Sequence, residues 1–205
     1  MVRLCLASSS PRRRELLARL GLPFTVVSAE VDEAVADDLP PGQLVETLAI
    51  RKARAARVEE GLVIGADTVV ICRGRIFGKP RDAAEAVAML SSLQGTSHQV
   101  YTGVAVRRVE DGFLAVGHEV TTVRFRPVTR REIELYVATG EPMDKAGAYA
   151  AQGLGAIFID RIEGCFFNVV GLPLAKLAAL MKACGVDILS LRKDLIGRGR
   201  ISPND

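Results

Sequence analysis

Apolar positions along the first part of the chain alternate between short continuous runs, typical of buried strands, and the spacing of three to four residues that is typical of helices. The continuous runs predict strands at residues 2–7 and 24–27. Between them, a helix is expected to begin at Pro11 with Ser10 as its N-cap and to end at Gly21. The chain therefore opens as a strand, a helix and a second strand.

A second predicted helix, over residues 43–60, has a broad apolar face that includes Leu48 and Ala56. Lys52 falls inside this face, one turn after Leu48 and one turn before Ala56. An unpaired ammonium on a buried face is costly, so Lys52 needs a carboxylate or phosphate partner, unless its methylenes carry the charge out to solvent.

The run 62–72 is almost unbroken in its apolar character and predicts a buried strand, which only Asp67 and Thr68 interrupt. Aspartate is disfavoured in strands and expensive to bury. We therefore expect Asp67 to mark a strand end, a metal ligand, a general base or a turn carboxylate with satisfied hydrogen bonds.

Later segments combine strands and helices. Two β-branched stretches, 98–106 and 113–125, flank a hairpin signal at residues 110–112. Further helices are predicted from the capping patterns Asp82/Glu85 and Thr129/Glu132 and after Leu172-Pro173, the last to about Cys184. The hairpin argues against a purely parallel sheet, so we expect an α/β fold with a mixed, elongated sheet flanked by helices. Residues 1–190 are expected to form one domain, or two lobes around a cleft, and residues 191–205 a basic, flexible tail.

Composition narrows the function classes. The chain has 205 residues, 49% of them hydrophobic, and a net charge of only +3, which does not require a nucleic-acid partner. The first apolar run is too short for a signal or a membrane span, so we expect neither export nor membrane contact. Four dispersed cysteines and two histidines, His98 and His118, lack the spacing of a zinc site, and each histidine is expected to be structural.

Three arginines, residues 12–14, load the first turn of the first helix. Cations there oppose the helix dipole and cost roughly 0.3–1 kcal/mol each unless an anion binds. A bound phosphate would reverse this sign, because backbone amides, serine hydroxyls and arginine forks all donate to phosphoryl oxygens. The alternative is a solvated basic helix start.

Two loops carry further candidate groups. Lys79 lies between Gly78 and Pro80, where it can deliver a point charge, although the surrounding spacing is not that of a Walker A motif. The segment 143–155 is dense in small residues and contains Lys145 and Gln152. Gln152 offers both a donor and an acceptor, which suits the edge of a nucleobase.

Taken together, the ordered segments of the chain resemble the Maf family, whose members are nucleoside triphosphate pyrophosphatases. The resemblance extends over about residues 4–190. It implies a fold like that of the enzymes that cleave inosine and xanthosine triphosphates, hydrolysis between the α and β phosphates, a divalent metal such as Mg²⁺ or Mn²⁺, and a cytoplasmic protein that forms a homodimer. The segments that carry it are Ser8-Ser-Ser-Pro-Arg-Arg, Lys52-Ala, Gly65-Ala-Asp-Thr-Val-Val, Gly78-Lys-Pro, Tyr101-Thr-Gly-Val, Asp144-Lys-Ala-Gly-Ala-Tyr and Asn168-Val-Val-Gly-Leu-Pro.

Carried over residue by residue, the resemblance makes Asp67 the proton acceptor and a metal ligand, with Glu33 assisting at the metal or the water. It places the triphosphate among Ser8, Arg12, Arg13, Lys52, Lys79 and Lys145. Whether Asp67 acts mainly as base or as ligand stays open.

The family divides by substrate, and three positions resemble the branch that acts on dTTP and UTP: Arg12 after Pro11, Thr68 after Asp67, and Gln152 before Gly153. The resemblance therefore implies that Thr68 and Gln152 shape the base pocket. Alternative functions are a pyrophosphatase for 7-methyl-GTP or for inosine and xanthosine triphosphates, and a non-enzymatic, nucleotide-binding septation regulator.

Overall fold

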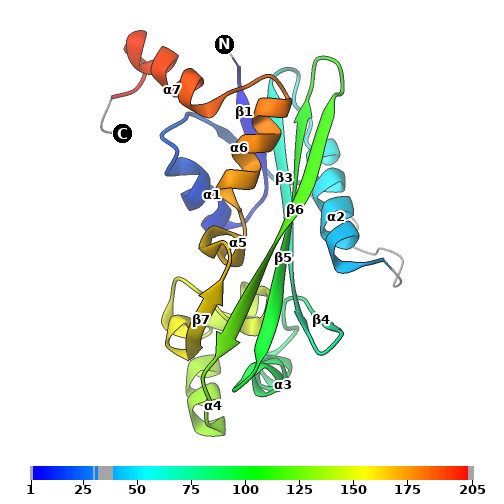
Figure 1. The fold of residues 1–205 in the computed structure, drawn as a ribbon, viewed down its shortest axis with the longest axis vertical. Helices are drawn as coiled ribbons and strands as arrows, with labels where there is room; N and C mark the ends of the chain where they lie inside the picture. The colour runs from blue at the N-terminus through cyan, green and yellow to red at the C-terminus, as the bar shows by residue number, and fades with distance from the viewer. Residues whose placement is uncertain (1, 30, 32–38, 203–205) are drawn as a thin grey trace. The chain divides into compact units, whose positions relative to one another are not determined.

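The structure is a computed structural model, and it describes residues 2–29, 31 and 39–202. The chain combines strands and helices, beginning with alternation of the two and ending with three consecutive helices (Figure 1). Their bounds are β1 (Leu4–Ala7), α1 (Pro11–Ala18), β2 (Thr25–Val27), α2 (Pro41–Ala55), β3 (Leu62–Cys72), β4 (Arg75–Phe77), α3 (Ala83–Leu93), β5 (Ser97–Arg108), β6 (Leu114–Phe125), α4 (Arg130–Ala138), the 3₁₀ helices η1 (Glu141–Asp144), η2 (Ala146–Ala148) and η3 (Leu154–Phe158), β7 (Ile159–Glu163), α5 (Phe166–Val170), α6 (Leu174–Ala183) and α7 (Ile188–Gly197).

The strands form one mixed sheet in the order β2-β1-β3-β5-β6-β7, with β4 paired to β3. Strand β1 runs parallel to both β2 and β3, whereas the pairs β3–β4 and β6–β7 are antiparallel. The predicted hairpin joins β5 to β6, and in its turn the Arg108 amide donates to the Phe113 carbonyl over 2.8 Å. The expected mixed α/β fold is confirmed.

The chain divides into two compact units, which we call unit 1 (Met1–Asp67, Gly103–His118 and Gly171–Asp205) and unit 2 (Thr68–Thr102 and Glu119–Val170). The amino-acid sequence predicts one domain or two lobes around a cleft for residues 1–190. Strands β3, β5 and β6 each contribute residues to both units.

In unit 1, helix α2 approaches the strands closely because glycines face it. A Cβ atom on Gly65 would lie 2.3 Å from the Ala49 carbonyl oxygen, and one on Gly103 would lie 2.3 Å from the Val45 carbonyl oxygen. Small side chains complete this contact. The buried cluster consists of Cys5, Ala7, Ala49, Ala53, Ala56, Val63 and Ala105. The close approach at Gly65 and Gly103 therefore determines how far Lys52 of α2 lies from β3.

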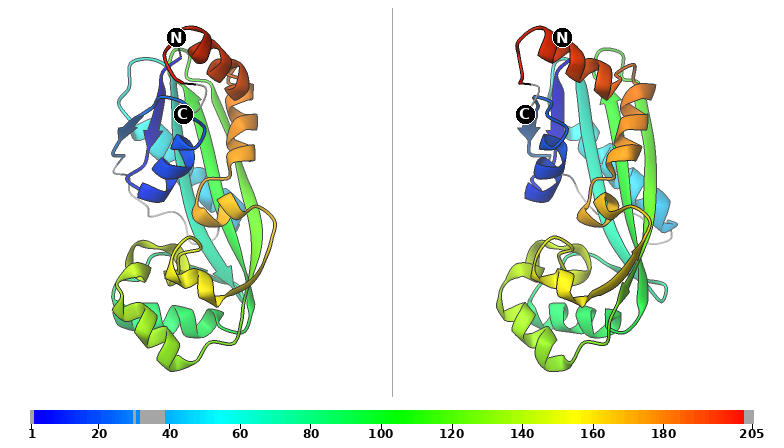
Figure 2. Two further views of the ribbon diagram at one scale, coloured as in Figure 1. Left: turned by 90° about the vertical axis from the view of Figure 1, so that its left-hand side faces the viewer. Right: turned by 60° about the vertical axis from the view of Figure 1, so that its left-hand side comes forward.

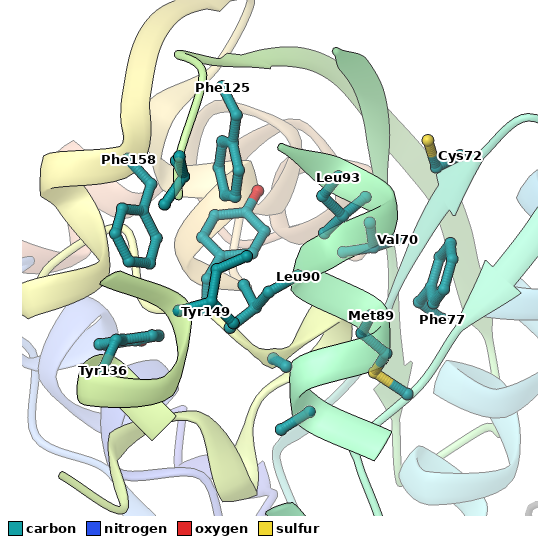
Figure 3. Packing of buried hydrophobic residues seen from close by; sticks show 14 of the residues in the cluster. Val70, Cys72, Phe77, Met89, Leu90, Leu93, Phe125, Tyr136, Tyr149 and Phe158 are labelled. Atoms are coloured by element: carbon teal, nitrogen blue, oxygen red, sulfur yellow. The ribbon is translucent and has the colours of Figure 1, made fainter. Parts of the chain in front are cut away.

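In unit 2, aromatic side chains form the core against which α3 packs (Figure 3). The rings of Phe125 and Tyr149 meet edge to face at 4.8 Å between centroids, and those of Tyr136 and Phe158 meet in the same way at 5.1 Å. Helices α3 and α4 lie side by side in both views of Figure 2. Tyr136 and Tyr149 therefore anchor the ends of the loop that carries Lys145.

Two predicted boundaries are wrong. Helix α2 ends at Ala55 rather than at residue 60, because Ala56 is extended and buried and its carbonyl accepts from Arg107 over 3.1 Å. The predicted flexible tail begins inside a helix, since residues 191–197 belong to α7.

The buried Leu195 fixes helix α7, and Arg192 donates to the carbonyls of Leu20 and Gly21 just beyond α1. Figure 2 shows α7 as the red helix that follows α6. Among the described residues, no helix is long and apolar enough to cross a membrane.

Candidate functional site

Lys52 and Asp67 form an ion pair in unit 1. The Lys52 Nζ lies 2.5 Å from Oδ1 of Asp67, and each side chain is only 12% exposed. Lys52 therefore has the carboxylate partner that its place on the apolar helix face requires, and its charge does not extend to solvent. Asp67 lies within β3, so the expectation of a strand end or a turn is wrong. The ammonium offsets the cost of placing a carboxylate there.

The strand period explains why these two side chains meet. Alternate residues of a strand share a face, so Asp67 points to the same side of β3 as Gly65. Gly65 is the residue that packs directly under α2, against Ala49 and Ala53. Lys52 belongs to the same stretch of α2, and its side chain meets the carboxylate. Because Gly65 has no Cβ, α2 can lie close enough to β3 for the Lys52 side chain to reach the Asp67 carboxylate.

Ser8 and Arg13 form a second polar group of unit 1, between the end of β1 and the start of α1. Arg13 Nε donates to the Gly171 carbonyl over 2.8 Å, and its Nη1 donates to Ser8 Oγ over 3.4 Å. Ser8 Oγ also accepts from the Ser10 amide over 3.2 Å. Arg13 is thus held by the protein rather than extended into solvent.

The strand register brings Ser8 level with the part of β3 that contains Asp67. Ala7 of β1 pairs with Gly65 of β3 in parallel register. Ser8 follows Ala7, and Asp67 is two residues beyond Gly65. Ligands of α/β folds commonly bind outside the carboxyl ends of parallel strands. Ser8 therefore lies where a ligand is expected, just beyond the carboxyl end of β1, and Asp67 lies beside it within β3.

Helix α1 begins as predicted. Ser10 is the N-cap, its side chain accepts from the Arg13 amide, and Pro11 occupies the first turn. No acidic residue of this turn offsets the arginines. Arg12 is half-buried, whereas Arg14 is exposed. The helix therefore retains an N-terminus that favours an anion.

In unit 2, Lys145 is fixed by its neighbours in the chain. Its Nζ donates to the Glu141 carbonyl over 2.6 Å and to Oδ1 of Asp144 over 2.5 Å, and its side chain is 13% exposed. The Lys79 loop is joined to the same segment, because the Gly147 amide donates to the Gly78 carbonyl over 3.0 Å. The structure thus brings together the loops of two lysines that the resemblance assigned to phosphate.

Glu141 holds the turn that follows Gln152, a role that sequence reasoning missed. Its carboxylate accepts from the amides of Leu154 and Gly155, both over 3.0 Å, and from the Tyr136 hydroxyl over 2.9 Å. Burial raises the pKa of Glu141, but donation from these groups outweighs it and leaves the pKa below its ordinary value. A Cβ on Gly153 would lie 2.4 Å from this carboxylate, so a larger residue after Gln152 would have to displace the Glu141 side chain from its hydrogen bonds.

Glu141 thus orders both Lys145, through its carbonyl, and the Gln152 turn, through its side chain. The available signal was a carboxylate next to Pro142 at the start of a loop rich in small residues, which alone does not distinguish a clamp from a solvated charge.

Thr68 belongs to a hydrogen-bonded chain within unit 2. Its hydroxyl lies 2.9 Å from that of Thr102 on the neighbouring strand β5. The Thr102 hydroxyl donates to the Asn168 carbonyl over 3.0 Å. Thr102 and Asn168 are fully buried. Both belong to segments that the resemblance singled out without giving them a role.

The histidines occupy structural positions. His98 is buried beside Phe125, its Nε2 lies 2.9 Å from the Tyr149 hydroxyl, and burial lowers its pKa to about 4. His118 contacts Glu46 over 2.8 Å.

The other residues that the resemblance singled out differ in their exposure. Gln152 and Lys79 are exposed. Glu33 lies outside the described residues. All four cysteines are unbridged, with Cys165 only half-buried. Among the described residues, no cluster of three or more histidine, cysteine or carboxylate side chains gathers around a point.

The Maf-like protein family model matches residues 3–184, a range that contains every predicted site residue. The dTTP/UTP pyrophosphatase of Moorella thermoacetica is 55% identical over 92% of this chain and 98% of its own. Those of Pelotomaculum thermopropionicum and Desulforamulus reducens are also 55% identical, over 92% and 90% of this chain and 100% and 97% of theirs.

Proposed function

Because this chain belongs to the Maf family, we propose that it hydrolyses dTTP and UTP to the nucleoside monophosphate and pyrophosphate. The observation that carries the proposal is the Lys52–Asp67 pair, a carboxylate and a cation held 2.5 Å apart in a largely buried position. Relatives that are named dTTP/UTP pyrophosphatases match the chain over nearly its whole length.

Asp67 accepts the proton of the water that attacks the α-phosphorus. The bond from the α-phosphorus to the bridging oxygen of the β-phosphate breaks, and pyrophosphate leaves with the bonding electrons. Positioned carboxylates of this kind contribute typically 10²–10⁴-fold to rate. Lys52, which contacts Asp67 in the structure, donates to a phosphate oxygen when substrate binds.

The remaining cations bind the triphosphate. Arg12, Arg13 and Ser8 at the start of α1 and Lys79 and Lys145 of unit 2 donate to its oxygens. Phosphoryl transfer depends mainly on such positioning and charge stabilisation. Arg13 and Lys145 are already oriented by backbone carbonyls, so little side-chain entropy is lost on binding.

The Asp67 carboxylate is an oxygen ligand of the kind that a divalent cation takes. Mg²⁺ prefers oxygen ligands and is commonly bound by one or two carboxylates together with substrate phosphates, so Asp67 with Glu33 would hold Mg²⁺ or Mn²⁺. When bound, the metal would stabilise negative charge on the phosphate oxygens.

The base is read by groups of unit 2. Gln152 carries both a donor and an acceptor, which complement the imide of uracil or thymine, and Glu141 holds the turn that presents it. Thr68 borders the base. We place the enzyme in the cytoplasm as a homodimer, with neither membrane nor nucleic acid as a partner.

A substrate panel tests this proposal. Purified protein is assayed with dTTP, UTP, 7-methyl-GTP and ITP in the presence of Mg²⁺ or Mn²⁺, and pyrophosphate and orthophosphate are scored separately. We expect pyrophosphate from dTTP and UTP at the highest kcat/KM. A profile led by 7-methyl-GTP or ITP would transfer the chain to another substrate class, and the absence of any turnover would favour a nucleotide-binding regulator.

A further inference from the structure

The direction of the hydrogen bonds along Thr68, Thr102 and Asn168 is fixed by their chemistry. A threonine hydroxyl has one proton, and a carbonyl can only accept. Thr102 donates its hydroxyl proton to the main-chain carbonyl of Asn168 over 3.0 Å. In the 2.9 Å contact between the two hydroxyls, Thr102 must therefore accept and Thr68 must donate.

Hydrogen bonds of the Asn168 side chain keep the main-chain carbonyl of this residue in place. Its side-chain amide donates to the Val100 carbonyl over 3.0 Å and to the Thr121 hydroxyl over 2.9 Å. Thr121 in turn donates to the Cys165 carbonyl and accepts from the Cys165 amide, both over 3.1 Å. Because Asn168, Thr102 and Thr121 are all buried, water does not compete for these groups.

The Thr68 hydroxyl therefore donates its single proton to the Thr102 hydroxyl. Toward any other group, the Thr68 hydroxyl can act only as an acceptor. Uracil and thymine carry a proton on N3 and donate there, whereas cytosine has a lone pair on N3 and accepts. An acceptor that faces another acceptor leaves both groups unsatisfied, which costs more than the loss of a contact.

We infer that Thr102 and the Asn168 carbonyl are specificity-determining: they orient the Thr68 hydroxyl as an acceptor that selects bases with a protonated N3. This inference rests on the proposed function, because it takes Thr68 to border the base. Thr102 acts through Thr68 and is a positioning residue. Thr102 and Asn168 belong to the segments Tyr101-Thr-Gly-Val and Asn168-Val-Val-Gly-Leu-Pro, so the inference assigns both segments a role in substrate specificity.

The test compares UTP with CTP, which share the ribose and the triphosphate, so that the ratio of their kcat/KM values isolates the base. Thr102→Val removes the hydroxyl and leaves the Thr68 proton uncommitted. We expect the UTP/CTP ratio to fall by about tenfold or more. Thr102→Ser retains the hydroxyl and should keep the ratio near that of the wild type. Thr122→Val serves as a control, because Thr122 of β6 lies outside this chain of hydrogen bonds.

Binding of the products UMP and CMP, measured by calorimetry, provides a readout independent of turnover and should show the same change in ratio. An unchanged ratio in folded Thr102→Val would overturn the inference. If Thr102→Val does not fold, Thr68→Val and Thr68→Ser decide: the inference requires that the ratio fall in the former and persist in the latter. Failure of the proposed function looks different, since wild-type protein would then release no pyrophosphate from UTP or dTTP.

Discussion

Lys52 Nζ and Asp67 Oδ1 lie 2.5 Å apart, between a helix and a strand whose close approach depends on Gly65. The Lys52 ammonium neutralises the Asp67 carboxylate, which is largely buried within a strand and would otherwise have no counter-charge. It also lies beside the carboxylate to which we assign proton transfer. One contact therefore serves both the fold of unit 1 and the proposed reaction.

Lys52→Met removes the ammonium and leaves the Asp67 carboxylate largely buried without its partner. Breaking a buried pair costs about 3–5 kcal/mol, and the remaining exposure of 12% places this pair near the lower figure. We expect urea unfolding to show a loss of about 3 kcal/mol. The double variant Lys52→Met/Asp67→Leu should regain most of it while staying inactive. A double variant no more stable than Lys52→Met would show that the pair is not coupled.

Glu141→Gln replaces an oxygen that accepts from Leu154 or Gly155 with an amide that donates, so the turn after Gln152 loses its clamp. We expect KM for UTP to rise about tenfold, with a smaller change in kcat, because the lost bonds position the base rather than the reacting water. Steady-state kinetics measure the split. The matched control is Glu134→Gln, which alters an exposed pair with Arg130 on α4. Equal KM values in both variants would refute the positioning role.

Acid should destabilise the fold through His98. Burial lowers the pKa of His98 to about 4, whereas an unfolded histidine titrates near 6.5. Below about pH 6.5 the unfolded chain binds a proton that the folded chain does not bind until about pH 4, so stability falls as the pH decreases through this window. The effect approaches roughly 3 kcal/mol at its lower end.

Unfolding free energies at pH 7 and pH 4.5 test this effect. His98→Gln keeps a polar group facing Tyr149 but does not titrate, so it should lose less stability than the wild type over the same interval. Parallel losses would mean that other groups account for the acid sensitivity.

Helix α7 should contribute to stability through one side chain. Leu195 is 2% exposed and Leu189 of the same helix is 78% exposed. We expect Leu195→Ala to lower the free energy of unfolding by about 2–5 kcal/mol and Leu189→Ala to change it by less than about 0.5 kcal/mol. Denaturant titration of both variants measures the difference. Equal, small effects would restore the interpretation of this segment as a tail that does not support the fold.

Sequence reasoning succeeded where local chemistry decides the outcome. Ser10 and Thr129 cap helices as predicted, and the apolar run 62–72 is the strand β3. Lys52 was identified as needing a partner because helical periodicity alone places it on the buried face. The identity of that partner depended on how α2 lies over β3, which is a tertiary property.

The misses have the same physical origin. The apolar face predicts a helix as far as residue 60, but α2 ends at Ala55 because Ala56 is extended and buried and its carbonyl accepts from Arg107. Glu141 was overlooked because its partners, Leu154 and Gly155, lie over ten residues away along the chain. The direction of the Thr68 hydrogen bond follows only when strands β3 and β5 and helix α5 are seen together.

The central claim is that Asp67 drives release of pyrophosphate from a pyrimidine nucleoside triphosphate, and the direct measurement compares wild type with Asp67→Asn on UTP by ³¹P NMR. Asp160→Asn, an exposed aspartate paired with Arg124, is the control. We predict that the wild type and the control each form one pyrophosphate for every UMP. For Asp67→Asn, kcat should fall by about 10²–10⁴-fold while calorimetry shows that nucleotide binding is retained. Formation of UDP and orthophosphate, or an Asp67→Asn protein that turns over at the wild-type rate, would contradict the account.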